Sequence, residues 1–211
     1  MPVDPPLYPV NLVVAGRRCL VVGGGRVARQ KAAELVACEA VVDVVAPRID
    51  PEGAELAGVT AHERAYEPGE AAGYRLVITA TDDPAVNRQV RDDADAAGIW
   101  VNSADDVANC TFTLPARIRQ GPILVTFATG GHSPALARWM RRHYGTEIGP
   151  EYLTLLQLLE EERSRLQQAG TPTEGLDWQR ALDSGMLDLV REGHLAEAKE
   201  RLQACLSSSS D

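Results

Sequence analysis

Three consecutive glycines, standing between a buried apolar run and a helix-like pattern, are the part of this 211-residue chain best suited to chemistry. Gly23, Gly25 and Ala28 have the G-x-G-x-x-A spacing of a turn that binds the pyrophosphate of a dinucleotide. The first glycine allows the tight bend, the second lets phosphate approach the backbone, and the small third residue lets helix and strand pack closely. Free N–H groups and the helix dipole then attract phosphate. The alternative is a Gly-rich turn in another kind of α/β protein.

Two neighbouring acids, Asp105 and Asp106, stand in a polar loop that follows an apolar run. No lysine or arginine lies near them in the sequence to neutralise them. A carboxylate at the mouth of a sheet can accept a proton, with its pKa set by its surroundings. Earlier in the chain, Asp82 and Asp83 precede Pro84, where either acid could cap a helix. The backbone just before them is also where an α/β sheet contacts its ligand.

A cationic block lies within an acidic chain whose net charge is −9. Pro115–Thr146 contains no Asp or Glu, and its basic residues are Arg117, Arg119, Arg138, Arg141, Arg142, His132 and His143. Arginine suits bidentate recognition of carboxylate or phosphate, so the block can attract an anion. A solvated helix face, or pairing with a neighbouring subunit, explains the charge equally well. The negative balance of the whole chain argues against nucleic acid as a partner.

The elements that position these groups follow from the hydrophobic pattern. Five short β-rich runs predict a parallel sheet of Rossmann type: Cys19–Val22, Ala40–Ala46, Val59–Arg64, Tyr74–Thr81 and Ile99–Asn102. A hairpin of Thr111–Ile118 and Ile123–Thr129 then breaks the alternation of strands and helices. Later helices are expected over 134–144, Glu151–Ala169, Leu182–Val190 and His194–Leu206. We therefore expect an α/β fold in three parts: a Rossmann domain over 1–114, a hairpin and helix segment over 115–148, and a small helical domain over 149–211.

The choice between NAD and NADP stays open on these residues. In a Rossmann unit an acid at the end of the second strand holds the ribose hydroxyls. That strand ends here in Val45-Ala46-Pro47-Arg48, and Asp43 lies too early within it. Arg48 could instead reach a 2′-phosphate.

Composition sets further bounds. The apolar share of 45% is enough for a normal core, and the apolar runs are strand-sized, so we expect no membrane span. The first residues show no basic region followed by an apolar stretch, and we expect no signal peptide. The four cysteines are scattered, which favours buried free thiols and a reducing cytoplasm.

Taken together, these motifs resemble the precorrin-2 dehydrogenases, the N-terminal module of siroheme synthases, over nearly the whole chain. The resemblance rests on Leu20–Lys31, Ala80–Asp83 with Asn87, Asn102 with Asp105, and Thr129–Arg138. The chain ends too soon to hold the family's uroporphyrinogen methyltransferase domain, so we expect the stand-alone form.

The resemblance implies an oxidoreductase that uses NAD to convert precorrin-2 to sirohydrochlorin. In some members the same cavity also inserts a metal ion into sirohydrochlorin. This second activity is that of a ferrochelatase, which is classed as a lyase and takes Fe²⁺ or Co²⁺ as a substrate. No resident metal is implied. A homodimer is implied, with Thr111–Tyr144 at the subunit interface. The cationic block then has an explanation, because precorrin-2 is a polycarboxylate.

Matching the motifs residue by residue implies three sets of site residues. The catalytic residue is Asp105, as general base or as an aid to proton removal from a pyrrole nitrogen. The cofactor set is Gly23, Gly24, Gly25, Arg26, Val27, Pro47, Arg48, Thr81, Asp82 and Asn102. The substrate set is Thr129, Gly130, Gly131, His132, Ser133 and Arg138, with Thr129 where some members carry serine.

Two other functions compete with this interpretation. A non-catalytic NAD-sensing module would use the Rossmann domain to gate a partner and would need neither the cationic block nor Asp105. An ordinary NADP-dependent reductase would be favoured by a Tyr-x-x-x-Lys pair, which the sequence lacks. The residues alone do not decide whether metal insertion occurs or which tetrapyrrole is the end product.

Overall fold

The computed structural model describes residues 6–104, 106 and 109–207. The chain forms two compact units. The first comprises Met1–Leu114 with Thr129–Ser133, and the second Pro115–Ala128 with Pro134–Asp211. The division into three parts expected from the sequence stays a prediction.

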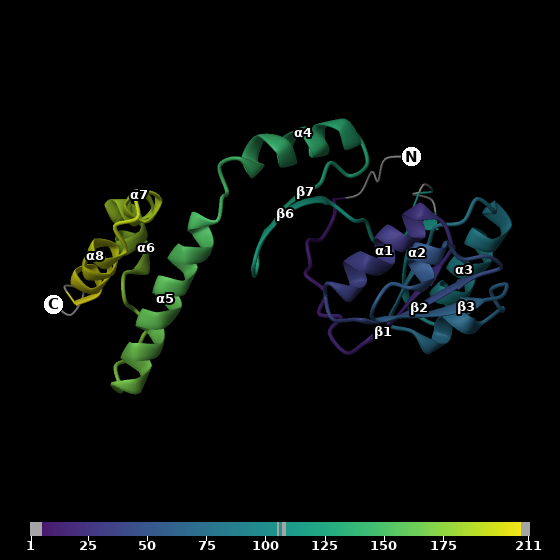
Figure 1. The fold of residues 1–211 in the computed structure, drawn as a ribbon, viewed down its shortest axis with the longest axis horizontal. Helices are drawn as coiled ribbons and strands as arrows, with labels where there is room; N and C mark the ends of the chain where they lie inside the picture. Colours follow the sequence, from purple (N-terminus) through teal and green to yellow (C-terminus); the bar gives the residue numbers. More distant parts are fainter. Residues whose placement is uncertain (1–5, 105, 107–108, 208–211) are drawn as a thin grey trace. The chain divides into compact units, whose positions relative to one another are not determined.

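The first unit is built on a five-stranded parallel sheet with the order β3-β2-β1-β4-β5 (Figure 1). Its strands are β1 (Arg18–Val22), β2 (Val41–Ala46), β3 (Val59–Glu63), β4 (Leu76–Thr79) and β5 (Trp100–Ser103). The strand order reverses between β1 and β4, and α/β proteins of this kind bind ligands at the carboxyl edge beside that switch point. The predicted Rossmann-type fold class is confirmed.

Helices cover both faces of this sheet because side chains of a strand alternate between them. The helices of the first unit are α1 (Arg26–Val36), α2 (Pro51–Ala54) and α3 (Pro84–Ala96), with a short 3-10 turn, η1 (Glu70–Gly73). Ala28, Ala32 and Leu35 of α1 share one apolar core with Val21 of β1. On the opposite face, Val90 and Ala94 of α3 share a second core with Leu20 and Val77. Because all the strands are parallel, their carboxyl ends lie at one edge of the sheet, between these two cores.

The segment after β5 differs from the prediction. Thr111 lies along the outer edge of β5, where its N–H donates to the Val101 carbonyl at 2.8 Å and its hydroxyl accepts from the Val101 N–H at 2.9 Å. The first hairpin strand, β6, therefore begins later than the predicted Thr111 and covers Ala116–Gln120. The strand predicted over Thr111–Ile118 is therefore wrong for its first residues, because Thr111 pairs with β5 instead.

The second unit contains the predicted hairpin and helices. Strands β6 and β7 (Ile123–Phe127) pair antiparallel, and α4 (Pro134–Gly145) packs against both. The remaining helices are α5 (Glu151–Gln168), α6 (Trp178–Ala181), α7 (Leu187–Arg191) and α8 (Leu195–Ser207). They enclose an apolar core that includes Leu155, Met186 and Leu202.

A break replaces the continuous helix expected over Leu182–Val190. Residues Leu182–Met186 form a π turn, η3, and Gly185 within it has φ 86°. A positive φ suits glycine and does not continue a right-handed helix. Across the part of the chain that the structure describes, none of the helices has the length and apolar content needed to cross a bilayer.

Candidate functional site: a dinucleotide cradle at the carboxyl edge of the sheet

The glycine turn is held between two neighbouring chain segments. Gly23 has φ 136°, and a Cβ there would collide with the carbonyl group of Ala80 at the end of β4. A Cβ at Gly24 would collide with the carbonyl oxygen of Arg48, in the loop after β2. The N–H of Asp50 in that loop donates to the Gly24 carbonyl at 2.8 Å. The fold itself therefore requires glycine at positions 23 and 24.

Gly25 is different, because the fold has no need for a glycine there. Its φ of −91° and ψ of −173° are extended backbone that any residue adopts, and a Cβ would meet no atom within 4 Å. It is exposed and precedes α1, which has no side-chain cap and no acid in its first turn. The free N–H groups at this helix end can bind phosphate, and the open space over Gly25 admits it. The residues present thus fit the pyrophosphate of a dinucleotide.

The other predicted cofactor residues of this side lie at the same edge. Arg26 and Val27 form the exposed first turn of α1. Pro47 and Arg48 are exposed in the loop that follows β2. Arg48 forms no ion pair with any described residue, so its guanidinium stays available to a ligand.

At the end of β4, side chains fix the turn into α3. The Thr81 hydroxyl donates to Asn87 Oδ1 at 2.8 Å, and Asn87 Nδ2 donates back to the Thr81 carbonyl at 3.0 Å. Asp83 caps α3, since its Oδ1 accepts from the Ala85 N–H at 2.8 Å. The predicted capping falls to Asp83, and Asp82 is left exposed beside the carboxyl edge.

Asn102, predicted to contact cofactor, is 7% exposed and has a structural partner. Its Nδ2 donates to the carbonyl of Phe112 at 2.9 Å and so fixes the segment that covers β5. In the following loop, Asp106 Oδ2 accepts from Asn109 Nδ2 at 2.7 Å. Asp105, the predicted catalytic residue, lies outside the described residues.

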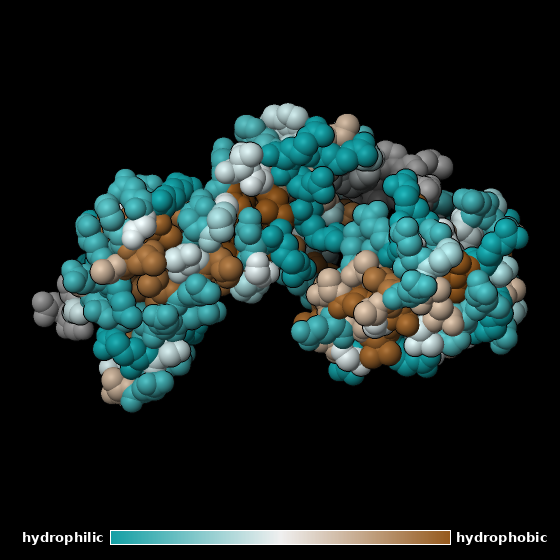
Figure 2. All heavy atoms as spheres, viewed as in Figure 1, coloured by the Kyte–Doolittle hydropathy of each residue, from teal (hydrophilic) through white to brown (hydrophobic). Residues whose placement is uncertain are grey.

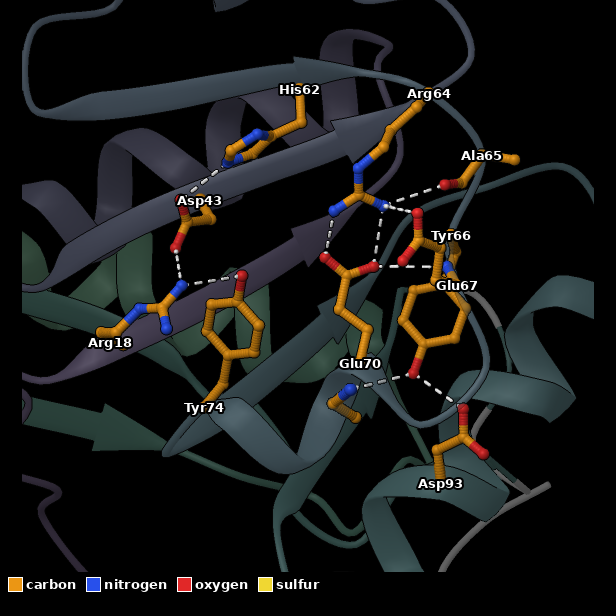
Figure 3. Close-up of polar contacts among 11 residues, drawn as sticks. Arg18, Asp43, His62, Arg64, Ala65, Tyr66, Glu67, Glu70, Tyr74 and Asp93 are labelled. Atoms are coloured by element: carbon orange, nitrogen blue, oxygen red, sulfur yellow. Dashed lines mark hydrogen bonds and ion pairs between the residues drawn. The ribbon is translucent and has the colours of Figure 1, made fainter.

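Asp43 is engaged on the face of the sheet that carries α3, as Figure 3 shows. Its two oxygens accept from Arg18 Nη2 and His62 Nε2, each at 2.9 Å, and Arg18 also lies 4.5 Å from the ring centre of Tyr74. Burial raises the pKa of Asp43, but the hydrogen bonds from His62 and Arg18 outweigh it and hold the pKa below its ordinary value. Asp43 is therefore a buried ion-pair partner, and both of its oxygens are already hydrogen-bonded.

One acid at the carboxyl edge was missed by the sequence reasoning. Glu63 is the last residue of β3, and its register partner is Ala46, the last residue of β2. Its Oε1 accepts from the Ile49 N–H at 3.2 Å, within the loop that also holds Arg48. No local signal identifies this residue, because its position depends on the pairing of β2 with β3.

The predicted substrate residues fall in both units. Thr129–Ser133 form a turn in the first unit, with Gly130 at φ 59° and Gly131 at φ 80°. The N–H groups of His132 and Ser133 donate to the Thr129 carbonyl and hydroxyl at 3.0 and 3.1 Å. His132 is exposed in this turn.

Arg138 belongs to the second unit, on α4, whose face shown in Figure 2 is mostly hydrophilic. In the hairpin and α4, four exposed arginines form no ion pair with the described residues: Arg119, Arg138, Arg141 and Arg142. On the same helix, the rings of Trp139 and His143 stack with centroids 4.7 Å apart. The described residues include no group of three or more His, Cys, Asp or Glu side chains that could hold a metal ion.

A parallel sheet of this order, with a glycine turn opening onto the first helix, defines a dinucleotide-binding Rossmann domain. The chain belongs to the family described as "Putative NAD(P)-binding", which matches residues 10–116.

Relatives extend the likeness beyond that domain. The siroheme synthase of Nitrosococcus oceani is 36% identical over 203 residues, covering 94% of this chain and 43% of the relative. The siroheme synthase of Acinetobacter baylyi is 35% identical over 207 residues, covering 95% and 45%. The chain spans less than half the length of these relatives. A solved structure named SirC, precorrin-2 dehydrogenase, shares the fold with TM-score 0.74 and 24% identity, covering 94% of this chain and 98% of that one.

Proposed function

We propose that the chain is a dehydrogenase that uses NAD to oxidise precorrin-2 to sirohydrochlorin in siroheme biosynthesis. The observation that carries the proposal is the extent of the likeness to siroheme synthases, over 94% of the chain. A Rossmann domain alone would suit many dehydrogenases. The likeness continues through the hairpin and the C-terminal helices, so it concerns more than the cofactor domain.

The cofactor half of this activity rests on the cradle at the glycine turn. NAD supplies the hydride acceptor when it is bound. The backbone at Gly24 and Gly25 and the free N–H groups of α1 would hold the pyrophosphate, with Arg26 and Val27 lining it. Pro47 and Arg48 would lie on the adenosine side of the cradle. Thr81 and Asp82, which follow β4, and Asn102, near the carboxyl end of β5, would stand on the nicotinamide side.

The substrate half rests on charge. Precorrin-2 is a polycarboxylate, and arginine binds carboxylates with two parallel hydrogen bonds. The exposed guanidinium groups of α4, including Arg138, have no ion pair among the described residues and would attract it. In the first unit, the turn Thr129–Ser133 would contact a carboxylate through the backbone of its two glycines.

Removal of two hydrogens from the macrocycle also requires a proton acceptor. We assign this role to Asp105 on its match to the family aspartate, and a general base contributes about 10²–10⁴-fold to the rate. Asp106, whose carboxylate is already hydrogen-bonded to Asn109, serves the loop.

Three further features belong to the same proposal. Fe²⁺ or Co²⁺ would be a second substrate, inserted into sirohydrochlorin. The protein would act as a homodimer through Thr111–Tyr144, a segment that exposes Leu136, Trp139 and Tyr144. It would work in the cytoplasm, where its four free cysteines remain reduced.

The experiment is to incubate the full chain with precorrin-2 and NAD and to follow the sirohydrochlorin absorption spectrum. Formation of sirohydrochlorin together with NADH supports the proposal. NAD binding without any conversion would favour the non-catalytic sensing module instead. Subsequent addition of Fe²⁺ or Co²⁺ tests metal insertion separately.

A further inference from the structure

In Rossmann domains an acid at the end of the second strand binds the adenosine ribose, and β2 has no acid at this position. A different carboxylate, that of Glu63, lies next to it on the neighbouring strand. β2 ends at Ala46, and Pro47 and Arg48 follow. Glu63 ends the neighbouring strand β3 directly opposite Ala46, so its side chain starts from the same carboxyl edge. Among parallel Rossmann sheets, this part of the edge faces the adenosine half of the dinucleotide.

The Glu63 carboxylate is oriented by a hydrogen bond from the backbone of the loop after β2. Oε1 accepts from the Ile49 N–H at 3.2 Å, which fixes the side chain against the loop after β2. Oε2 has no hydrogen-bond partner among the residues that the structure describes, and the side chain is exposed. An anchored carboxylate with a free oxygen can accept hydrogen bonds from vicinal hydroxyls.

The acid that lies nearest in the chain to Arg48, Asp50, already has an ion-pair partner. Asp50 lies in the loop after β2, and its carboxylate is 3.7 Å from Arg29 Nη1, which also pairs with Glu52. The Arg29 guanidinium offsets the charge of both acids. Glu63 forms no ion pair with the described part of the chain, so its negative charge remains effective toward a ligand.

We infer that Glu63 is the residue that selects NAD over NADP in this protein. Its free oxygen accepts from the adenosine ribose hydroxyls, and its charge repels a 2′-phosphate at the same position. Arg48, exposed in the adjacent loop, has the opposite effect on a 2′-phosphate, and Glu63 outweighs it because the carboxylate is anchored to the Ile49 backbone. This inference rests on the proposed use of NAD.

The test compares the binding of four ligands by calorimetry: NAD, NADP, adenosine 5′-monophosphate and adenosine 2′,5′-bisphosphate. Glu63→Gln keeps an oxygen for the Ile49 N–H but removes the charge, so the fold should be retained. We expect the native protein to prefer NAD, and the ratio of NAD to NADP affinity to fall about 10- to 100-fold in the variant. The two mononucleotides should show the same change, because they carry only the adenosine half.

Asp50→Asn is the matched control, since it removes an acid from the loop after β2 that is already paired with Arg29, and it should leave the ratio nearly unchanged. Glu63→Ala serves as a second variant, with thermal unfolding as the check that both remain folded. An unchanged ratio in the folded Glu63→Gln protein would overturn the inference. Native preference for NADP would overturn it as well, while leaving dinucleotide binding intact. If the native protein binds neither dinucleotide, the inference falls together with the proposed function.

Discussion

Substitution of Gly25 separates what the glycine turn does for the fold from what it does for the ligand. Its backbone suits any residue, and an added Cβ has open space around it. Gly25→Ala should therefore fold normally and gain about 0.4–1 kcal/mol of unfolding free energy, because alanine reduces the freedom of the unfolded chain. Gly24→Ala should instead lose about 1–3 kcal/mol, since its Cβ would meet the Arg48 carbonyl oxygen.

Position 25 should matter for NAD binding even though it matters little for stability. Gly25→Asp places a negative charge beside the pyrophosphate, and two unit charges about 4 Å apart near a protein surface repel by about 4 kcal/mol. Screening at this exposed turn leaves about half of that, or a rise of about 30-fold in the Kd for NAD. Gly25→Asn has nearly the same size without the charge, so the difference between the two variants isolates the electrostatic effect.

Calorimetry with NAD gives the affinity, and thermal unfolding followed by circular dichroism gives the stability. The reasoning predicts a stable Gly25→Asp protein that binds NAD poorly. Native affinity for NAD in a folded Gly25→Asp variant would refute the placement of the pyrophosphate over this turn. A large loss of stability in Gly25→Ala would refute the claim that the fold does not need glycine there.

Three further predictions concern the catalytic residue, the substrate surface and a buried ion pair. Asp105→Asn should lower kcat about 10²–10⁴-fold with NAD affinity nearly unchanged, and Asp106→Asn should do much less; equal activities would assign both acids to the loop. Arg138→Ala or Arg141→Ala should raise the KM for precorrin-2, and added salt should raise the KM of the native protein. A KM that does not change with salt would refute the proposal that these arginines bind the substrate carboxylates. Because the pKa of Asp43 is held low in the fold, its stabilisation is present above about pH 4 and lost as pH falls further; acid titration of unfolding free energy should show a shallower decline in Asp43→Asn.

The sheet could be predicted from the sequence because its central strands are short apolar runs rich in β-branched residues. Cys19–Val22 and Leu76–Thr79 are buried on both faces, and such runs stand out in any local window. The Asp83 cap was equally local, since an acid before proline marks the start of a helix. Each of these features depends on residues that are close together in the chain.

The parts that differed depend on contacts between distant residues. The residue types that follow Thr111 favour a strand, but they do not show that Thr111 pairs with β5. The segment around Gly185 has helical spacing, and only the backbone shows the break. Glu63 becomes relevant only through the register of β3 with β2. The roles assigned to the site residues, Asp105 among them, stay predictions.

The attachment of Thr111 to the outer edge of β5 also bears on aggregation. An uncovered edge strand presents N–H and carbonyl groups that can recruit a strand from another molecule. Thr111 occupies both groups of Val101, and the Asn102 amide fastens the next residue, Phe112, alongside. Loosening this segment, for example by Thr111→Pro, would uncover the backbone of β5 and let it pair with a strand from another molecule.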